Sequence, residues 1–460
     1  MNMGTIGTLT ALILLVVLVY KGWGVIQTSF LAALIVILTN GPAMGNFFDA
    51  FQNYFLGVPV PLPGGGYSQT SGLTGFVAAN MFVIVTGSLF GAVMAESGAA
   101  KSIAIGLGKR FGAKNAILIT MVATAILIAG GISAFVCMYA VFPLAVVLFH
   151  QADIPRKYLL GSYWCAVFVC VGLPGVPTVH NIVPSEYLGT DVMAGPVVGL
   201  ICTAFAFTAD YLFLTISCKR AKARGEHFVV NPETDGVQIQ ADGGGENMPA
   251  FLPSLLAPAM AVFLCILSNY TLVRAGICST NNAVSFVLIV VTLYCLVAFG
   301  RFLPKKMETV TNGIQSGLVP VFLVAFVVAF GNVVTHTELY ANIVDFALNL
   351  DMSPYFSAVL SVNILAGITA SGLGGLQIFM ASCAQHFVEL GVNPGLLHRV
   401  AAMSAAGLDS LPNNGSIVTS LKIMGSDFKE SYGVIFVVTV VITIAASSLG
   451  AAVATILTIL

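Results

Sequence analysis

The stretch AGLDSLPNNGSIVT, residues 406–419, interrupts a long apolar segment with polar and helix-breaking residues. It contains the carboxylate of Asp409 and then Pro412, whose ring cannot continue an α-helix. An acidic residue inside a membrane span is energetically costly and usually functional. We therefore expect a membrane helix that is broken in its middle, with a binding site at the break.

The composition of the whole chain indicates an integral membrane protein. The sequence has 460 residues, of which 58% are hydrophobic and 8% are charged, and its mean hydropathy is +0.97. Soluble domains have about 25% charged residues, so this chain needs lipid to cover its apolar surface. The formal net charge is −1 and the basic residues form no large patch, so we expect no nucleic-acid partner.

The apolar segments predict an all-α polytopic fold with ten transmembrane spans and two re-entrant helical hairpins. The stretches 115–150 and 353–388 are each too long for one crossing, which takes about 20 residues. Small residues interrupt them at 129–133 (AGGIS) and 368–375 (ITASGLGG). Such backbone lies at membrane depth only where protein or water covers it. The ten spans are 5–20, 24–39, 75–96, 158–184, 192–217, 250–269, 283–300, 314–335, 396–421 and 431–460.

The distribution of basic residues supports this topology. We place the N-terminus outside and let each hairpin return to the side from which it enters. Of the 18 Lys and Arg residues, only Arg274 and Arg399 then fall outside, as the enrichment of basic residues in cytoplasmic loops requires. The predicted location is a bacterial inner membrane, with both termini outside.

Two segments of similar sequence indicate an internal repeat. FGAVMAESGAAKSIA at 90–104 aligns without gaps with FGNVVTHTELYANIV at 330–344. We therefore predict a first repeat at 1–217 and a second repeat at 250–460, joined by a hydrophilic cytoplasmic linker at 218–249.

The order of elements predicts that the two repeats are inverted. Each repeat would contain three scaffold spans, a hairpin, a broken span and a last span. Because this makes an odd number of crossings, the second repeat begins on the opposite side of the membrane. Secondary transporters of this kind bind substrate and coupling ion near the middle of the membrane, between broken helices. The scaffold spans lie within 5–96 and 250–335.

The first repeat has its own broken span, GLPGVPTVHNIVP at 172–184, in which Pro174, Pro177 and Pro184 are predicted to interrupt the helix. We expect the two broken spans and the two hairpin tips to surround the site. Half-helix N-termini offer N–H groups to an anion there. The predicted substrate-binding residues are Gly131, Ser133, Pro174, Thr178, Asn181, Ser371, Gly372, Asn413, Asn414, Ser416 and Thr419.

Asp409 and His180 are the predicted proton-coupling residues. Asp409 could instead cap the helix that restarts after Pro412, and His180 could be a neutral hydrogen-bonded group. The other polar residues could instead satisfy the unwound backbone. No Lys or Arg lies in the predicted site, so N–H dipoles and hydroxyls would hold the substrate, which favours one carboxylate over several.

Other residues and functional classes have weaker support. Asp210 lies inside a span, and we expect it to pair with Lys219 or Arg220 or to extend toward the interface. The nine cysteines show no metal-ligand spacing, so no metal or other cofactor is expected. The motifs GxxxxGK[ST] and HExxH are absent, which argues against an ATP-driven pump and a metalloprotease. A channel or an intramembrane enzyme is the least favoured alternative.

The sequence resembles the gluconate permease family, within the ion transporter superfamily. The resembling segments are GGISAFVCMYAVFPLAVVLFHQADIPRKYL (130–159), LPGVPTVHNIVPSEYLGT (173–190) and NPGLLHRVAAMSAAGLDSLPNNGSIVTSLKIMG (393–425), followed by KESYG. The resemblance implies proton-coupled uptake of gluconate, 3-hydroxybutyrate, D-serine or a related small monocarboxylate, and it is nearer to the hydroxybutyrate-type branch. It also implies a homodimer in lipid, whose transport domain moves as an elevator against a fixed scaffold.

Two motifs depart from the family pattern. The second motif often reads LPHNG, whereas this chain has Asn413 in place of the histidine. The first motif often reads LPGTPQIQN, whereas this chain has Val176, Thr178 and His180. Proton coupling would therefore rest on Asp409 or His180, and sodium coupling within the same superfamily is the alternative.

Overall fold

The computed structural model describes residues 2–459 with several gaps, and the described residues form helices and no strands. The all-α fold class is thereby confirmed for this part of the chain. The gaps are residues 22, 58–71, 133, 232–247, 274, 343–351, 370, 413, 415, 418–419 and 422–423.

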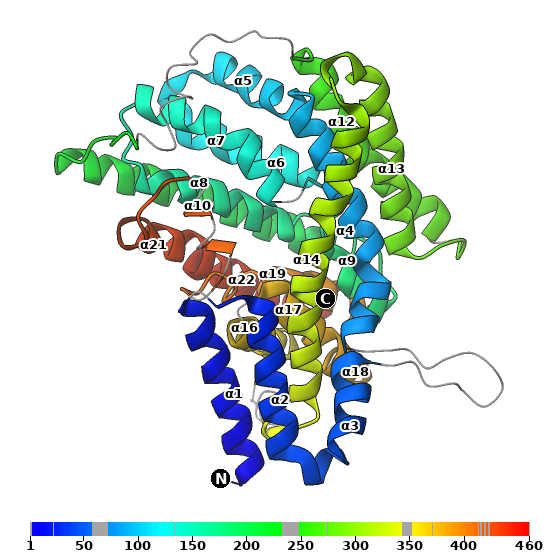
Figure 1. The fold of residues 1–460 in the computed structure, drawn as a ribbon. Helices are drawn as coiled ribbons and strands as arrows, with labels where there is room; N and C mark the ends of the chain where they lie inside the picture. Colours follow the sequence, from blue (N-terminus) through cyan, green and yellow to red (C-terminus); the bar gives the residue numbers. More distant parts are fainter. Residues whose placement is uncertain are drawn as a thin grey trace.

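The helices follow the order that the apolar segments predict (Figure 1). The first half contains α1 (Met3–Tyr20), α2 (Val25–Met44), α3 (Phe47–Ala50), α4 (Gly72–Glu96), α5 (Ala99–Phe111), α6 (Ala116–Ala129), α7 (Ala134–Gln151), α8 (Lys157–Val171), α9 (Val179–Leu188) and α10 (Pro196–Ala223). The second half contains α12 (Phe251–Ser268), α13 (Thr280–Ala298), α14 (Lys306–Thr335), α16 (Pro354–Thr369), α17 (Gly372–Ser382), α18 (Ala384–Glu389), α19 (Pro394–Ser404), α21 (Phe428–Phe436) and α22 (Ile442–Ile459).

Six of the described helical segments are long and apolar enough to cross a membrane by length and composition. The remaining apolar helices are shorter, in part because each break divides one apolar stretch into two pieces. The count of ten spans therefore stays a prediction. The six segments are Gly72–Glu96, Pro196–Ala223, Phe251–Val273, Asn281–Ala298, Lys306–Thr335 and Phe428–Ile459.

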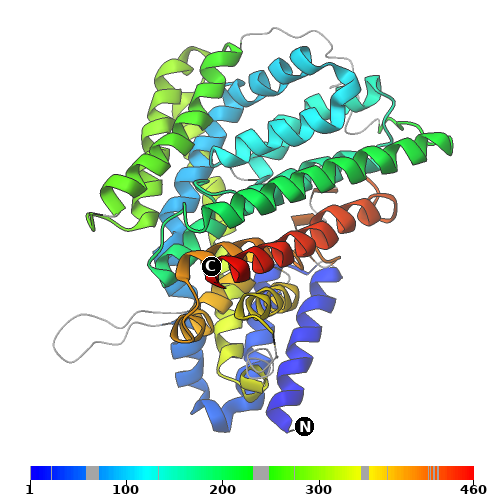
Figure 2. The ribbon, with the colours of Figure 1, turned by 180° about the vertical axis from the view of Figure 1, so that it is seen from behind.

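Helices α4 and α14 form the central pair of the fold, and they run side by side in both views (Figures 1 and 2). Two glycines of α14 allow this close approach, because a Cβ at Gly317 would lie 2.8 Å from the Cα of Val85, and one at Gly313 would lie 3.0 Å from the Cα of Leu89. Small residues at such contacts are typical of helix pairs in membranes.

The helices next to the central pair make equivalent contacts in the two halves of the chain. Helix α2 packs on α14, whereas α13 packs on α4. Within each half, α17 contacts α14 and α7 contacts α4. Two repeats related by a two-fold rotation would produce both of these pairs of equivalent contacts. The inverted repeat and its domain boundaries nevertheless stay predictions.

Both predicted hairpins break at their small residues. Helix α6 ends at Ala129, and Gly130 and Gly131 form the turn before α7. Gly131 has a φ of 92°, a conformation that favours glycine. Helix α16 ends at Thr369 and α17 begins at Gly372. The re-entrant path of these hairpins through a membrane stays a prediction.

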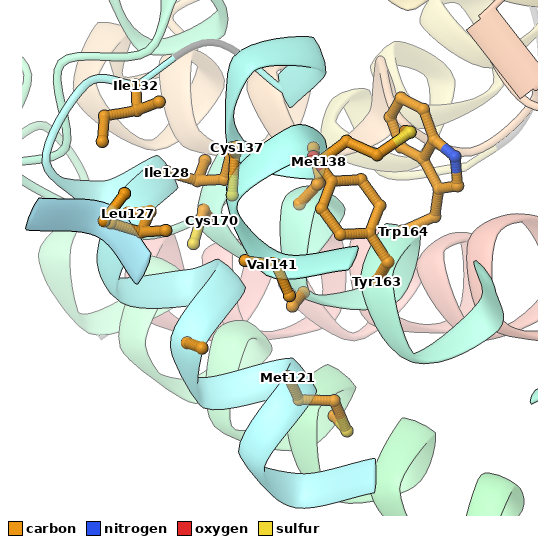
Figure 3. Packing of buried hydrophobic residues seen from close by; sticks show 14 of the residues in the cluster. Met121, Leu127, Ile128, Ile132, Cys137, Met138, Val141, Tyr163, Trp164 and Cys170 are labelled. Carbon is orange, nitrogen blue, oxygen red and sulfur yellow. The ribbon is translucent and has the colours of Figure 1, made fainter. Parts of the chain in front are cut away.

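The first hairpin packs on α8 through buried apolar side chains (Figure 3). Leu127 and Ile128 of α6, Cys137 and Met138 of α7 and Tyr163 of α8 belong to one hydrophobic cluster. Within a membrane, close van der Waals packing stabilises such contacts, because lipid is as apolar as the helices themselves. The hairpin and the first broken span are therefore one packed unit.

Both predicted broken spans are interrupted in the structure. The first is non-helical between Val171 and Val179, and the second α-helix ends at Ser404. The prediction that Pro184 belongs to the first interruption is wrong, because Pro184 lies inside α9. Pro184 is the sixth residue of α9, past the first turn, so its ring removes the helical hydrogen bond that a backbone N–H would donate to the carbonyl oxygen of His180.

Asp210 lies in the protein interior and not at its edge. It is 1% exposed, and neither carboxylate oxygen forms a hydrogen bond or an ion pair with any described residue. The predicted pairing with Lys219 or Arg220 is wrong. Those residues lie about 14 Å further along the α10 axis, and both are exposed to the surroundings.

We predict that Asp210→Val stabilises the protein. Burying a carboxyl without a hydrogen-bond partner costs about 1–3 kcal/mol, and valine has a similar volume. The measurement is the thermal unfolding of the purified protein in detergent, with Glu389→Gln as the control at an exposed acid. A lower unfolding temperature for Asp210→Val would show that the carboxyl has a favourable role in the folded state.

The second hairpin approaches the second break closely at Gly372. A Cβ added at this residue would lie 2.3 Å from the carbonyl oxygen of Ala405 and 3.1 Å from the Cβ of Asp409. Backbone atoms cannot yield as a flexible side chain does. Glycine at this position is therefore what allows α17 to start directly against the break.

We predict that Gly372→Ala destabilises the contact between α17 and the second break. Overpacking of this kind costs about 1–3 kcal/mol, and the unfolding temperature and the transport rate should both fall. The matched control is Gly433→Ala in α21, where a Cβ would meet nothing within 4 Å. Equal behaviour of the two variants would show that the close approach is unimportant.

Candidate functional site

The second break is held to the second hairpin by Asp409. Its Oδ1 accepts a hydrogen bond from the backbone N–H of Gly372 at 2.6 Å and another from Nδ2 of Asn414 at 3.0 Å. Gly372 is the first residue of α17, so the carboxylate lies at the positive end of a half-helix, where a negative charge is stabilised. Ser371 caps the same helix, because its Oγ accepts from the N–H of Gly374 at 3.1 Å.

Asn414 organises the backbone after Asp409. Its Nδ2 donates to the carbonyl oxygen of Asp409 at 2.7 Å, and its Oδ1 accepts from the N–H groups of Ser416 at 2.7 Å and Ile417 at 3.2 Å. The helical backbone resumes at Ser416. The side chain of Asn414 therefore satisfies hydrogen-bonding groups of the unwound backbone. The sequence left this role open as the alternative to substrate binding.

The first break ends at the N-terminus of α9 without a side-chain cap. Thr178 is the N-cap residue, but its hydroxyl forms no capping bond, and its Oγ1 is buried without a partner among the described residues. His180 lies in the first turn of α9 and forms no hydrogen bond with the described part of the chain. Thr178 and His180 thus lie beside backbone N–H groups at the start of α9, and no side-chain cap accepts a hydrogen bond from these groups.

Each hairpin tip meets the break of its own half. A Cβ at Gly131 would lie 3.3 Å from the Cγ of Pro177, next to the first break. The second tip meets the second break through Gly372 and Asp409. Pro174 packs against α10, where a Cβ at Gly199 would lie 2.8 Å from its Cγ. The predicted meeting of tips and breaks is therefore present within each half.

Arg399 contacts a predicted site residue, although no basic residue was expected at the site; its placement on the outer side of the membrane stays a prediction. It is 0% exposed, and its Nη1 donates to the carbonyl oxygen of Gly172 at 3.2 Å and to Oδ1 of Asn181 at 2.6 Å. Helix α19 begins at Pro394, so Arg399 lies within the helix and its long side chain reaches the first break. A charged residue inside a predicted span was the available signal.

Asn181 is fully engaged within the protein. Besides accepting from Arg399, its Nδ2 donates to the carbonyl oxygens of Leu173 at 3.1 Å and Val176 at 3.0 Å. The side chain is 0% exposed. Its contacts hold the shape of the first break, and a direct contact with substrate would require one of them to open.

Sequence reasoning missed two polar side chains near the site. The Oγ of Ser410 is buried and lacks a partner among the described residues, directly after Asp409. Gln377 of α17 donates from Nε2 to the hydroxyl of Tyr187 of α9 at 3.1 Å, so it connects the two halves. Three predicted residues, Ser133, Asn413 and Thr419, lie outside the described residues.

No three His, Cys, Asp or Glu side chains gather to hold a metal ion in the part of the chain that the structure describes. Besides the half-helix ends, the site contains amide and hydroxyl groups, the carboxylate of Asp409, the imidazole of His180 and the hydrogen-bonded guanidinium of Arg399. Such a set suits a small polar anion and a proton.

Comparisons with known proteins identify the class of this chain. The model of the GntP family permease matches residues 3–374. The uncharacterized transporter YxjC of Bacillus subtilis is 26% identical over 95% of this chain and 96% of its own length. The high-affinity gluconate transporter of Escherichia coli is 24% identical over 72% of this chain and 74% of its own length.

A solved structure supports the fold. The Alcanivorax borkumensis YdaH transporter, described as having an unusual topology, superposes with a TM-score of 0.55 at 11% identity. The match covers 99% of this chain and 98% of that chain. This likeness concerns the fold alone, whereas the family match covers most of the sequence. The chain therefore belongs to the GntP permease family, and it is a multi-pass membrane transporter and not an enzyme.

Proposed function

We propose that this permease imports a small monocarboxylate together with a proton. The candidates are 3-hydroxybutyrate, gluconate and similar hydroxy or amino acids, and the sequence motifs favour the hydroxybutyrate-type branch. The relative named as a gluconate transporter supports the class of substrate. The groups at the two breaks are mostly neutral donors and acceptors, which suits a small hydroxylated anion.

The observation that carries this proposal is the position of the Asp409 carboxylate at the N-terminus of α17. Its Oδ1 accepts from the N–H of Gly372 at 2.6 Å, and an anionic substrate would be attracted to the same N–H groups. Two carboxylates cannot share this place without strong repulsion. A proton on Asp409 removes its charge, weakens its hold on α17 and frees the helix end for the substrate anion.

The N-terminus of α9 offers the second set of contacts. The unpartnered Oγ1 of Thr178 is available to a hydroxyl or carboxylate of the substrate. His180, which forms no hydrogen bond with the described residues, is beside it in the first turn of α9. In this proposal the substrate bridges the two half-helix ends, and His180 is the alternative carrier of the coupling proton.

The arrangement of helices supports an elevator-type motion. The central pair α4 and α14, with α1, α2, α12 and α13, would form the scaffold. The hairpins and broken spans would form the transport domain, and they carry every proposed site residue. We further propose a homodimer in the inner membrane with both termini outside, the arrangement that the basic residues and the family resemblance support.

Sodium coupling is the second candidate, because two buried oxygen atoms near the second break lack hydrogen-bond partners among the described residues. One is the Oγ of Ser410, and the other is Oδ1 of Asn363 on α16. The latter points at Gly407, where a Cβ would lie 1.9 Å from it. Oxygen atoms of this kind are ligands for a hard cation.

Uptake by proteoliposomes separates the two candidates. Labelled 3-hydroxybutyrate and gluconate would be offered with a proton gradient or a sodium gradient imposed separately. Accumulation driven by protons alone is the expected result. Accumulation driven by sodium alone would remove the coupling role from Asp409, and uptake of neither compound would refute the proposed substrate class.

We predict that Asp409→Asn abolishes accumulation driven by a proton gradient but preserves exchange of labelled for unlabelled substrate. The amide cannot exchange a proton, yet its oxygen can still accept from Gly372. Asp427→Asn is the matched control, because Asp427 caps α21 in the same way at an exposed position. Proton-driven accumulation in Asp409→Asn would mean that Asp409 only caps α17.

We also predict that succinate does not compete with a transported monocarboxylate. A second carboxylate would lie near Asp409 without a free cation among the described site residues, since the five N–H groups of Arg399 already donate to protein oxygens. The measurement is inhibition of labelled uptake by excess succinate, with excess unlabelled 3-hydroxybutyrate as the positive control. Inhibition of comparable strength would contradict the preference for one carboxylate.

A further inference from the structure

The guanidinium of Arg399 is saturated by oxygen atoms of the first half. Its Nη1 bonds Gly172 and Asn181, whereas Nε and Nη2 both donate to the carbonyl oxygen of Ala194, at 2.9 and 2.8 Å. Nη2 also donates to the carbonyl oxygen of Val192 at 2.9 Å. These bonds use all five N–H groups of the side chain, so no donor is left for a substrate.

These bonds join three separate parts of the first half to one helix of the second half. Gly172 follows the end of α8, Asn181 lies in α9, and Val192 and Ala194 lie in the turn before α10. The nearby Asp191 carboxylate adds an electrostatic attraction. Arg399 therefore fixes the positions of both ends of the first break relative to α19, the helix that leads to the second break.

The surrounding backbone leaves room for this side chain. A Cβ at Gly195 would lie 2.8 Å from the Cβ of Arg399, and one at Gly199 would lie 2.9 Å from its Cδ. A Cβ at Gly172 would lie 2.7 Å from the Cγ of Met403, also on α19. Glycines on three segments thus permit the close approach of α19 to the first break.

Asn181 connects Arg399 to the backbone of the first break by hydrogen bonds. Its Oδ1 accepts from Arg399, and its Nδ2 donates to the carbonyl oxygens of Leu173 and Val176. Those carbonyls belong to the non-helical segment that ends at Thr178. The backbone that presents Thr178 is therefore fixed by a hydrogen-bond relay that begins on the other half of the molecule.

We propose that Arg399 is a positioning residue that sets substrate affinity without touching the substrate. Through Asn181 it holds the first break in the shape that presents Thr178 and the start of α9 to the second break. This inference rests on the proposed function for its effect on transport, but not for its effect on the shape of the break.

Lysine cannot replace arginine in this role. An ammonium group has three donors, whereas the planar guanidinium has five in a fixed arrangement. With Arg399→Lys, some of the four acceptors lose their donor while the positive charge is kept. This variant therefore separates the effect of the guanidinium's hydrogen-bond geometry from the effect of its positive charge.

The first test is hydrogen exchange of the purified full-length protein and needs no substrate. We expect Arg399→Lys to exchange faster than wild type over 172–182 and 190–195, with no change over 372–376. Arg220→Lys, at an exposed position of α10, is the matched control. Unchanged exchange over 172–182 in Arg399→Lys would overturn the proposal.

The second test is transport kinetics with the monocarboxylate that wild type accumulates. We expect Arg399→Lys to raise KM by about tenfold, equivalent to the loss of one net interaction, and to leave the maximal rate nearly unchanged. Asn181→Ala should raise KM similarly, and the double variant should add little. A reduced maximal rate with unchanged KM would indicate a merely structural role and overturn the proposal.

Asn181→Asp keeps the test decisive if Arg399→Lys does not fold. The carboxylate still accepts from Arg399, but it lacks the N–H donors to Leu173 and Val176. We expect KM to rise in this folded variant, and an unchanged KM would refute the relay.

Failure of the proposed function is distinguishable from failure of the relay. If wild type accumulates no monocarboxylate, the proposed function fails, while hydrogen exchange still decides the relay. Lost affinity with unchanged exchange in Arg399→Lys would mean that the guanidinium acts on the substrate directly, and it too would overturn the positioning role.

Discussion

Broken helices in an apolar environment expose backbone N–H and C=O groups that must find partners, and the rest of this structure depends on how that requirement is met. In lipid no water replaces the missing helical bonds. At the second break the carboxylate of Asp409 and the amide of Asn414 bind the backbone. At the first break the guanidinium of Arg399 and the amide of Asn181 do so.

The two solutions differ in chemistry, and the difference fits the proposed division of roles. A carboxylate can gain and lose a proton, whereas a guanidinium keeps its charge throughout the physiological range. The contact of Asp409 with α17 can therefore be released by a proton, while the contacts of Arg399 are permanent. In the proposed mechanism, the second break changes with the protonation of Asp409, whereas the first break keeps a fixed shape.

Close backbone approach is the second feature that both breaks share. Gly372 lies against Ala405, and Gly172, Gly195 and Gly199 surround α19 and Arg399. A side chain at any of these positions would separate segments that hydrogen-bond across the gap. Two of these residues, Gly172 and Gly372, lie in segments that the sequence marks as breaks, so the same glycines interrupt the helices and permit the close contacts.

The sequence alone determined the fold class and the places where helices break. Apolar segment length, together with Gly and Pro, reports local preferences, which is why the interruptions at 130–131 and 172–178 were predictable, as was the break at 406–419, which follows closely on the end of α19 at Ser404. The sequence also marked Asp409 as the acid to examine. It could not show that Arg399 belongs to the first break, nor that Asp210 is buried without a partner. Those facts depend on which helix faces meet across distances of hundreds of residues, and only the tertiary structure decided them.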